Sequence, residues 1–239
     1  MEPIPPFPQT GRSHRERRLT GPGETAPSGR LRLDAIADWL QQVAFADVVD
    51  AGVEGDAVWV LRRTRLRVER FPRLRETVAL ETACSGYGAS WAERRTRLRG
   101  DRGGRVEAVA LWVALDPATQ RPMRLGERFL GVYGASAGGR RVRARLRHPG
   151  PPDEAPAEPW LLRAAELDVA GHVNNAACWR AVEQFLPEPA DGAALEAEVE
   201  YHAPAAAGPA SLVRDGARAW LLAGDGRLHA SIALDGADG

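Results

Sequence analysis

Apolar and polar residues follow two periods along this chain, first that of a helix and then that of strands. Ile36, Leu40 and Val43 recur at three- to four-residue spacing, which predicts a helix over residues 34–49 with Asp34 as its N-cap. Alternation of apolar and polar residues predicts strands on either side of this helix. A short one precedes it and four follow it, over residues 13–19, 63–69, 77–82, 90–99 and 106–115.

The same order of elements returns later in the chain. A strand over residues 160–165 and a helix over 173–186 precede four more predicted strands, over residues 195–202, 211–214, 217–222 and 227–234. The repeat predicts an α+β fold of two similar halves, in which each antiparallel sheet wraps a helix. Pairing of the two sheets edge to edge would remove one open edge from each.

The segments outside these elements set the predicted domain boundaries. Residues 120–158 break the regular pattern with glycine, proline and arginine, and the run PGPPDEAPAEP is typical of a linker. We therefore predict four parts, a flexible arm, a first half, a linker and a second half, over residues 1–11, 12–125, 126–158 and 159–239.

Composition narrows the class of protein. The 239 residues carry 32 basic and 32 acidic groups, which excludes a histone-like or strongly acidic protein, and 44% apolar residues favour a globular body. Cys84 and Cys178 stand among apolar or small residues, so we expect buried free thiols and neither a disulfide framework nor a metal cluster. Trp39 and Trp112 are expected in the core. The N-terminus lacks a signal-peptide core and no stretch has the length of a membrane span, so we expect a cytoplasmic protein.

The segment LDVAGHVNN, residues 167–175, holds the most informative polar residues. A loop with Asp168 and His172 precedes a predicted helix, whose N-terminal amides could hold a carbonyl oxygen as it becomes an oxyanion. His172 could move a proton and Asp168 could orient it. The pattern suits attack on an activated acyl group. The alternative is structural, with Asp168 and Asn174 as caps and His172 as a polar loop residue.

This segment resembles the Asp-x-Asn-x-His-Val-Asn-Asn signature of the acyl-acyl-carrier-protein thioesterases. Residues 33–44 resemble the first helix of that family, 59–82 its next two strands, and 109–125 the strand and turn that close its first half. The resemblance runs from about residue 30 to the end of the chain. It implies a tandem hotdog fold, in which the acyl chain lies mainly in the first half and the chemistry lies in the second.

The resemblance also implies a function and its residues. The activity would be hydrolysis of acyl-carrier-protein (ACP) thioesters to free fatty acid and ACP in fatty acid biosynthesis, without a cofactor or a metal. Asp168 and His172 would be catalytic, and Val173, Asn174 and Asn175 would bind substrate, the amides near Val173 and Asn174 holding the thioester oxygen. Capping by Asn174 and Asn175 is the alternative.

Several polar residues of the family pattern are missing. Ala170 stands at the asparagine, Pro204 at a strand glutamate and Ala205 at a cysteine that often follows it. With Asp168 and His172 in place, hydrolysis could still proceed with fewer groups. It would be slower, because losing one positioned polar group commonly costs about 10²–10³ in rate. His202 is either a substitute polar group or a solvated strand residue, whereas Glu200 lies too far along the strand. Alternatives are therefore a thioesterase for acyl-CoA or polyketide-bound chains and a catalytically impaired acyl- or ACP-binding protein.

Five arginines cluster within residues 140–147, in the segment GRRVRARLR that begins with Gly139. Zero net charge and the lack of interleaved aromatic residues argue against nucleic-acid binding. The cluster would either dock an acidic ACP near the site or form a solvated face. The sequence leaves open whether the chain also forms a homodimer.

Overall fold

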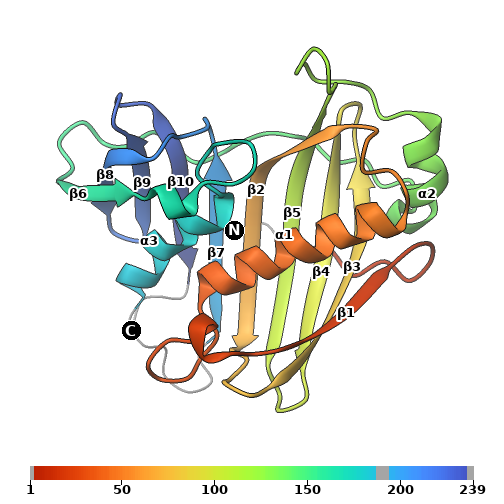
Figure 1. The fold of residues 1–239 in the computed structure, drawn as a ribbon, viewed down its shortest axis with the longest axis horizontal. Helices are drawn as coiled ribbons and strands as arrows, with labels where there is room; N and C mark the ends of the chain where they lie inside the picture. The colour runs from red at the N-terminus through yellow and green to blue at the C-terminus, as the bar shows by residue number, and fades with distance from the viewer. Residues whose placement is uncertain (1–2, 187–193, 236–239) are drawn as a thin grey trace.

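One antiparallel sheet runs through the part of the chain that the structure describes, residues 3–186 and 194–235. The computed structural model places the strands in the order β1-β3-β4-β5-β2-β7-β10-β9-β8-β6 (Figure 1). The strands in this part of the chain are β1 His14–Leu19, β2 Val58–Arg70, β3 Thr77–Tyr87, β4 Trp91–Gly100, β5 Arg105–Leu115, β6 Ala157–Leu162, β7 Leu195–Tyr201, β8 Gly208–Asp215, β9 Arg218–Ala223 and β10 Leu228–Asp235.

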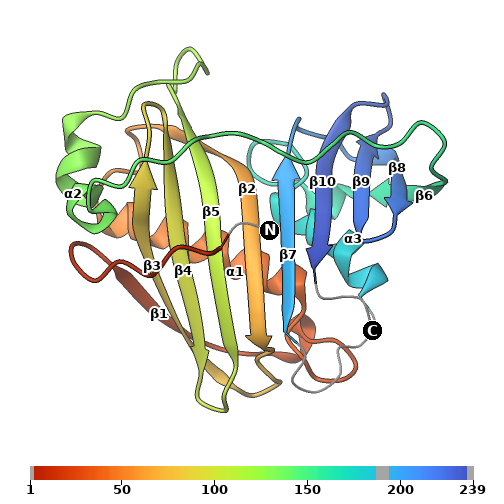
Figure 2. The same ribbon diagram turned by 180° about the vertical axis from the view of Figure 1, so that it is seen from behind.

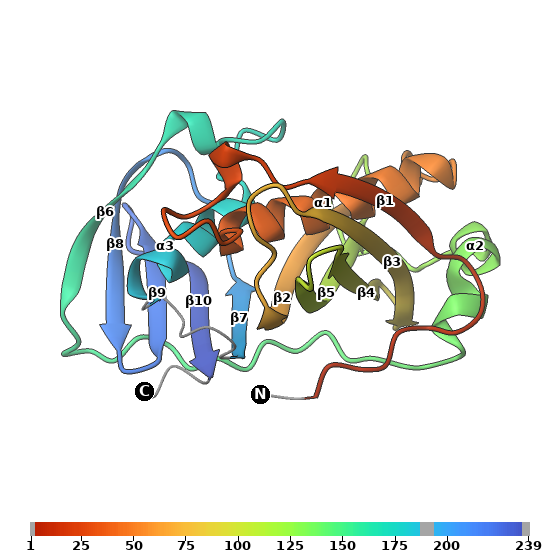
Figure 3. The ribbon, with the colours of Figure 1, turned by 90° about the horizontal axis from the view of Figure 1, so that it is seen from below.

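The helices divide this sheet into two halves. In the described residues they are α1 Leu33–Asp50, α2 Glu127–Ala137 and α3 Cys178–Phe185, with short 3-10 turns at Pro22–Glu24, Ala164–Glu166 and Asn175–Ala177. The sheet curves around α1 and α3, which lie on the same face, while α2 lies at the far end beside β3 (Figure 3). A helix wrapped by an antiparallel sheet thus occurs twice, which confirms the predicted α+β tandem hotdog fold.

The two halves meet through strands β2 and β7, which pair antiparallel at the centre of the sheet. On the face toward the helices, Leu66 of β2 pairs with Ala197 of β7, and both are buried. On the outer face, Arg65 pairs with Glu198. Apolar pairs on one face and opposite charges on the other specify this register. The predicted edge-to-edge joining of the two sheets is confirmed.

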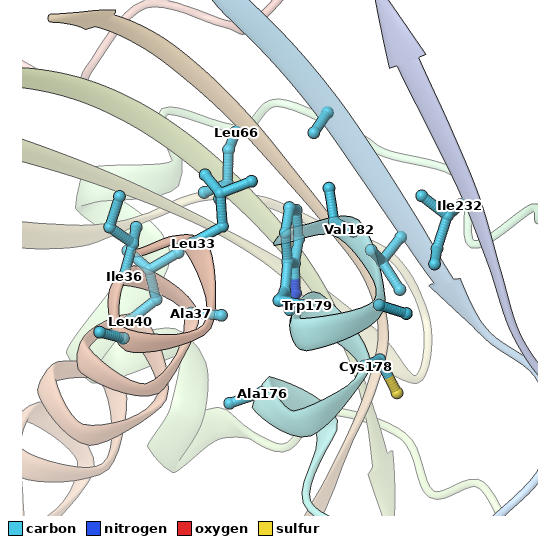
Figure 4. Packing of buried hydrophobic residues seen from close by; sticks show 14 of the residues in the cluster. Leu33, Ile36, Ala37, Leu40, Leu66, Ala176, Cys178, Trp179, Val182 and Ile232 are labelled. Carbon is cyan, nitrogen blue, oxygen red and sulfur yellow. The ribbon is translucent and has the colours of Figure 1, made fainter. Parts of the chain in front are cut away.

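A single hydrophobic core continues across the junction. Figure 4 shows Leu33 and Ile36 of α1 near Trp179 and Val182 of α3, all of them fully buried. Trp39 is buried in the same core, as predicted, whereas Trp112 is only partly buried against it. Both cysteines are buried free thiols, which also agrees with the prediction.

The start of α1 differs from the prediction. Arg32, not Asp34, occupies the N-cap position, and its side chain makes no capping hydrogen bond. Glu183 of α3 instead accepts a hydrogen bond from the Leu33 amide and pairs with Arg30 at 2.8 Å. A tertiary partner from the second half therefore replaces the local cap that the sequence suggested.

Two extended segments cross the outer face of the sheet, opposite α1 and α3 (Figure 2). The N-terminal segment places Phe7 under Arg97, whose guanidinium carbon lies 4.3 Å from the ring centroid. The second segment, residues 140–156, leads from α2 to β6; we call it the strap. The range predicted as a linker, residues 126–158, thus holds α2 and the strap. Among the described residues, no helix combines the length and the apolar character that a membrane span needs.

Candidate active site

The loop between the Ala164–Glu166 turn and α3 carries Asp168 and His172. It closes on itself, because the Asp168 amide donates to the His172 carbonyl at 2.8 Å and Gly171 adopts a φ of 74°, which suits glycine. Asp168 Oδ1 accepts from the Ala170 amide at 2.9 Å and the His172 amide at 3.4 Å. Asp168 therefore fixes the loop that holds His172, and His172 is exposed to solvent.

The amides after His172 have partners within the protein. Val173 donates to the Ala205 carbonyl at 2.9 Å and Asn174 to the Glu166 carbonyl at 2.8 Å. The helix α3 consequently begins at Cys178, after a 3-10 turn, and not at Val173 as we predicted. These two amides are not free to bind a substrate oxygen. The Val173 side chain lies in the core, and Asn175 begins the 3-10 turn.

Asn174 joins the two halves of the protein through its side chain. Its Oδ1 accepts hydrogen bonds from the Ala176 amide at 2.8 Å and from Nε2 of Gln41, on α1, at 2.9 Å. Because the Ala176 amide is a donor, it fixes the orientation of the Asn174 amide, and the Nδ2 group points away from these partners. Asn174 and Gln41 both line the large cavity described next.

The cavity has a volume of about 980 Å³ and lies mainly within the first half, between α1, α2 and the sheet. Apolar side chains dominate its wall, among them Ala44, Val48, Val53, Trp59, Trp112 and Phe129. Val169 and Asn174 bring the loop of the second half to the same cavity. Phe45, Val58 and Val169 are exposed lining residues, so the cavity opens to solvent at this apolar rim.

A buried ion pair lies at the cavity wall. Arg94 of β4 donates to Asp47 of α1 at 2.7 Å, and Arg12 donates to the other oxygen of Asp47 at the same distance. Burial alone would lower the pKa of Arg94, but Asp47 and the neighbouring Tyr133 and Cys84 together outweigh burial and raise it, so the guanidinium stays charged. Tyr133 of α2 packs on Arg94, and burial raises the pKa of its hydroxyl to about 12, against the influence of Arg94.

Three positions where the family pattern has polar residues carry alanine or proline here. Ala170 and Pro204 are exposed, and Ala205 is buried with its carbonyl bonded to the Val173 amide. His202, the suggested substitute, bonds Ser231 Oγ at 2.8 Å. This contact places its ring in a different cluster, described next.

That cluster, on the outer face of the sheet, is a chain of hydrogen bonds beneath the strap. His148 of the strap contacts Glu198 Oε1 at 3.1 Å and Ser231 Oγ at 3.0 Å, and Ser231 also contacts His202. Glu200 accepts from the His148 amide at 2.9 Å. We call these five residues the strap clasp.

Three residues of the strap clasp, His148, Glu198 and Glu200, have possible metal-ligand atoms within 4.8 Å of one another. Both oxygens of Glu200 already accept hydrogen bonds from strap amides. Arg63 and Arg65 lie 3.8 and 4.0 Å from Glu198. Two cations beside occupied carboxylates do not suit a bound metal ion, so the cluster is a structural clasp.

A buried cysteine–histidine pair lies behind the loop. Cys178 Sγ is 3.3 Å from His229 Nε2, and His229 Nδ1 is 2.6 Å from the Ala203 carbonyl. Burial raises the pKa of Cys178 to about 12 and lowers the pKa of His229. The thiol and the imidazole are both neutral, so this pair does not provide a thiolate nucleophile.

The sequence did not point to Gln41, Arg94 or Tyr133 as site residues. Gln41 lies on the predicted helix, but its partner Asn174 is 133 residues away. Arg94 sits among many strand arginines that pair with glutamates on the outer face. One signal was available, since Arg94 shares the inward face of its strand with apolar Ala92 and Leu98.

Comparisons with known proteins place these features among thioesterases. Residues 12–133, just over half of the chain, match the family of the acyl-ACP thioesterase N-terminal domain. An uncharacterised protein of Mycobacterium tuberculosis is 28% identical over 187 residues, which are 77% of this chain and 75% of that protein. Two solved structures share the fold. An acyl-ACP thioesterase from Bacteroides thetaiotaomicron has a TM-score of 0.75 and 15% identity, covering 93% of this chain and 98% of that one. A 12:0-ACP thioesterase from Umbellularia californica has a TM-score of 0.72 and 19% identity, covering 96% and 98%.

Proposed function

Because the chain belongs to the acyl-ACP thioesterase family, we propose that it hydrolyses acyl-ACP thioesters to free fatty acid and ACP in fatty acid biosynthesis. One observation carries the proposal: the apolar cavity of the first half is completed by Val169 and Asn174, from the loop that holds His172. An acyl chain in that cavity would have its thioester near the loop. The similar Umbellularia californica protein is a 12:0-ACP thioesterase, which supports the same substrate class.

The proposed chemistry uses few groups. His172 takes a proton from water as the water oxygen bonds to the thioester carbonyl carbon. Asn174 donates from Nδ2 to the carbonyl oxygen, in place of the Val173 and Asn174 amides, which have other partners. The carbon–sulfur bond then breaks, and the carrier's thiolate takes the proton that His172 holds, which returns His172 to its neutral form. Asp168 acts as a positioning residue by holding the loop.

The proposed partner is an acidic ACP whose pantetheine arm reaches the cavity through its apolar rim. The strap lies on the face of the sheet opposite α1, which carries the rim residue Phe45 (Figures 1 and 2). This position favours the solvated-face alternative for the strap arginines. Arg124 is exposed and lines the cavity, which makes it the better candidate for contact with an acidic carrier.

The proposal is tested by free-thiol release from matched panels of acyl-ACP and acyl-CoA thioesters. We expect turnover of acyl-ACP, and His172→Ala should lower it by about 10²-fold or more. His14→Gln, on the edge strand β1, is the matched control and should keep the wild-type rate. Faster turnover of acyl-CoA would reassign the carrier, and an unchanged rate for His172→Ala would remove His172 from the chemistry.

A second candidate is an acyl- or ACP-binding protein without turnover. It is favoured by Ala170 and Pro204, and by the absence of a hydrogen bond between the Asp168 carboxylate and the His172 ring among the described contacts. Calorimetric titration with acyl-ACP separates the two candidates. Tight binding with no thiol release in the same sample would establish the binding protein.

A further inference from the structure

Three hydrogen-bond donors interrupt the apolar wall of the cavity. Arg94, only 9% exposed, uses Nη1 for Asp47 and for a longer contact to Thr82. The Tyr133 hydroxyl lies beside Arg94 and Asp47, but neither it nor the Trp112 indole nitrogen, both buried, makes a hydrogen bond of ordinary length to a described residue. All three residues line the cavity.

The three donors lie close to one another. Trp112 of β5 pairs with Ala92 and Arg94 with Ala110, so Trp112 and Arg94 are diagonal neighbours on one face of the sheet. The Arg94 guanidinium carbon is 5.5 Å from the centroid of the Tyr133 ring. Buried polar groups in native proteins almost always have hydrogen-bond partners, so two neighbouring exceptions beside Arg94, the Tyr133 hydroxyl and the Trp112 indole nitrogen, point to a ligand in the cavity.

The chemistry of the donors limits what that ligand can be. Arginine and tryptophan only donate, and the raised pKa of Tyr133 keeps its hydroxyl protonated. The partner must therefore accept hydrogen bonds. The charges of Arg94 and Arg12 are already balanced by two carboxylates, Asp47, which both arginines contact, and Asp50, which pairs with Arg12. A neutral oxygen suits this site better than a further carboxylate.

The donors also lie at a distance from the loop. Gln41 bonds Asn174, and Asp47 bonds Arg94. Gln41 and Asp47 are six residues apart on α1, about 9 Å along the helix axis. A narrow gap beneath α1 is lined by Gln41, Arg94 and Trp112. An acyl chain with its thioester at Asn174 would pass the three donors several carbons further along.

We propose that the acyl chain of the substrate carries a neutral oxygen, an oxo or hydroxyl group within the chain, which Arg94, Tyr133 and Trp112 bind. This inference rests on the proposed function, because it assumes that the cavity holds an acyl chain. It divides the substrates into a preferred class, chains with an oxygen substituent at one position, and a disfavoured class, fully reduced chains. Fully reduced chains would leave the Tyr133 hydroxyl and the Trp112 indole nitrogen without an acceptor from the ligand, which weakens binding.

The test uses acyl-pantetheine analogues in which an amide nitrogen replaces the thioester sulfur. A thioesterase does not cleave these analogues, so binding is measured apart from turnover. One series has reduced chains and a second has a single oxo group at successive carbons of the same chains. Calorimetry with the full-length protein should show about 10-fold tighter binding for the oxo group at one position or two adjacent ones. Equal affinities at every position would overturn the inference, since water would then satisfy the donors equally well.

Two variants assign that preference to residues. Tyr133→Phe removes only the hydroxyl and should reduce the oxo preference at least threefold, with little change for the reduced chain. Trp112→Phe should act in the same direction. Trp59→Phe is the control, because Trp59 lines the cavity without a buried unpartnered nitrogen, and it should affect both series equally. A preference that survives both variants would overturn the assignment.

Two further results separate this inference from the proposed function. Selective binding of oxo amides by a protein that releases no thiol from any thioester would uphold the inference and refute the proposed hydrolysis. Hydrolysis of reduced acyl-ACP without a preference for oxo chains would uphold the proposed hydrolysis and refute the inference. A chain with a carboxylate at the preferred position should bind more weakly than the oxo chain, and tighter binding would refute the neutral oxygen.

Discussion

Asp168 acts on the loop through backbone amides and not through the ring of His172. Its carboxylate accepts from the Ala170 and His172 amides, so Asp168→Ala should release the loop and lower thioester hydrolysis about as much as His172→Ala, by about 10²-fold. Asp168→Asn keeps an acceptor oxygen at the same position and should retain most of the activity. Steady-state rates with acyl-ACP decide between the two variants. Equal loss in both would mean that the negative charge matters and not the loop geometry.

Ala170 is the second residue whose replacement tests the site. Ala170→Asn restores the hydrogen-bonding side chain of the family pattern, and the exposure of Ala170 leaves room for it on the solvent side. We expect a modest gain of a few-fold in thiol release, because Pro204 still lacks a polar group. Ala170→Ser is the smaller control and should gain less. An unchanged or lower rate with an intact fold would mean that the site has been rebuilt around alanine.

The sequence predicted residues that act locally better than those that act across the fold. Asp168 and His172 stood in one short motif, and the structure joins them through the loop backbone. Gln41 and Arg94 have roles that depend on partners far away in the sequence, Asn174 and Asp47. Spacing along the chain carries no information about such pairs.

At the scale of elements, α3 stabilises the start of α1. Glu183 bonds the Leu33 amide and pairs with Arg30, whose side chain is 5% exposed. Glu183→Gln keeps the shape but leaves Arg30 without this charge partner, so the free energy of unfolding should fall by about 1–3 kcal/mol. Urea denaturation measures the change. Glu158→Gln, an exposed glutamate on β6, is the control and should stay within about 0.5 kcal/mol of wild type.

Helices and strands were predictable from the sequence where one face of the element is buried and the other is exposed at regular spacing. Every strand of the first half was located from the sequence, although β2 begins five residues before its predicted start and β3 ends five residues after its predicted end. Helix α1 lies within one residue of its predicted ends. Helix α2 was missed, because Gly131 and Gly134 lower its helix propensity and few of its residues are buried. The start of α3 was misplaced, since Val173 and Asn174 bond to distant carbonyls instead of beginning a helix.

At the scale of the whole molecule, the two halves share one cavity. The cavity lies in the first half and its loop in the second, while Gln41 and Asn174 bond across the division. The β2–β7 pairing and the strap clasp hold this arrangement from the sheet side. Glu198 is central there, because it contacts His148 of the strap and lies near Arg63 and Arg65 of β2.

Acidification should therefore weaken the joined structure through Glu198. Burial opposes ionisation, but the hydrogen bond from His148 and the charges of Arg63 and Arg65 together lower the pKa of Glu198 below its ordinary value of 4.5. The stabilisation from a depressed carboxyl pKa is present above that ordinary value and is lost as the pH falls through the folded one. Urea denaturation between pH 6 and pH 3 should show falling stability, with a shallower fall in Glu198→Gln. Exposed Glu154→Gln should follow wild type. An identical slope for Glu198→Gln would mean that other carboxylates, such as Glu107 beside Arg95 and Arg99, cause the acid sensitivity.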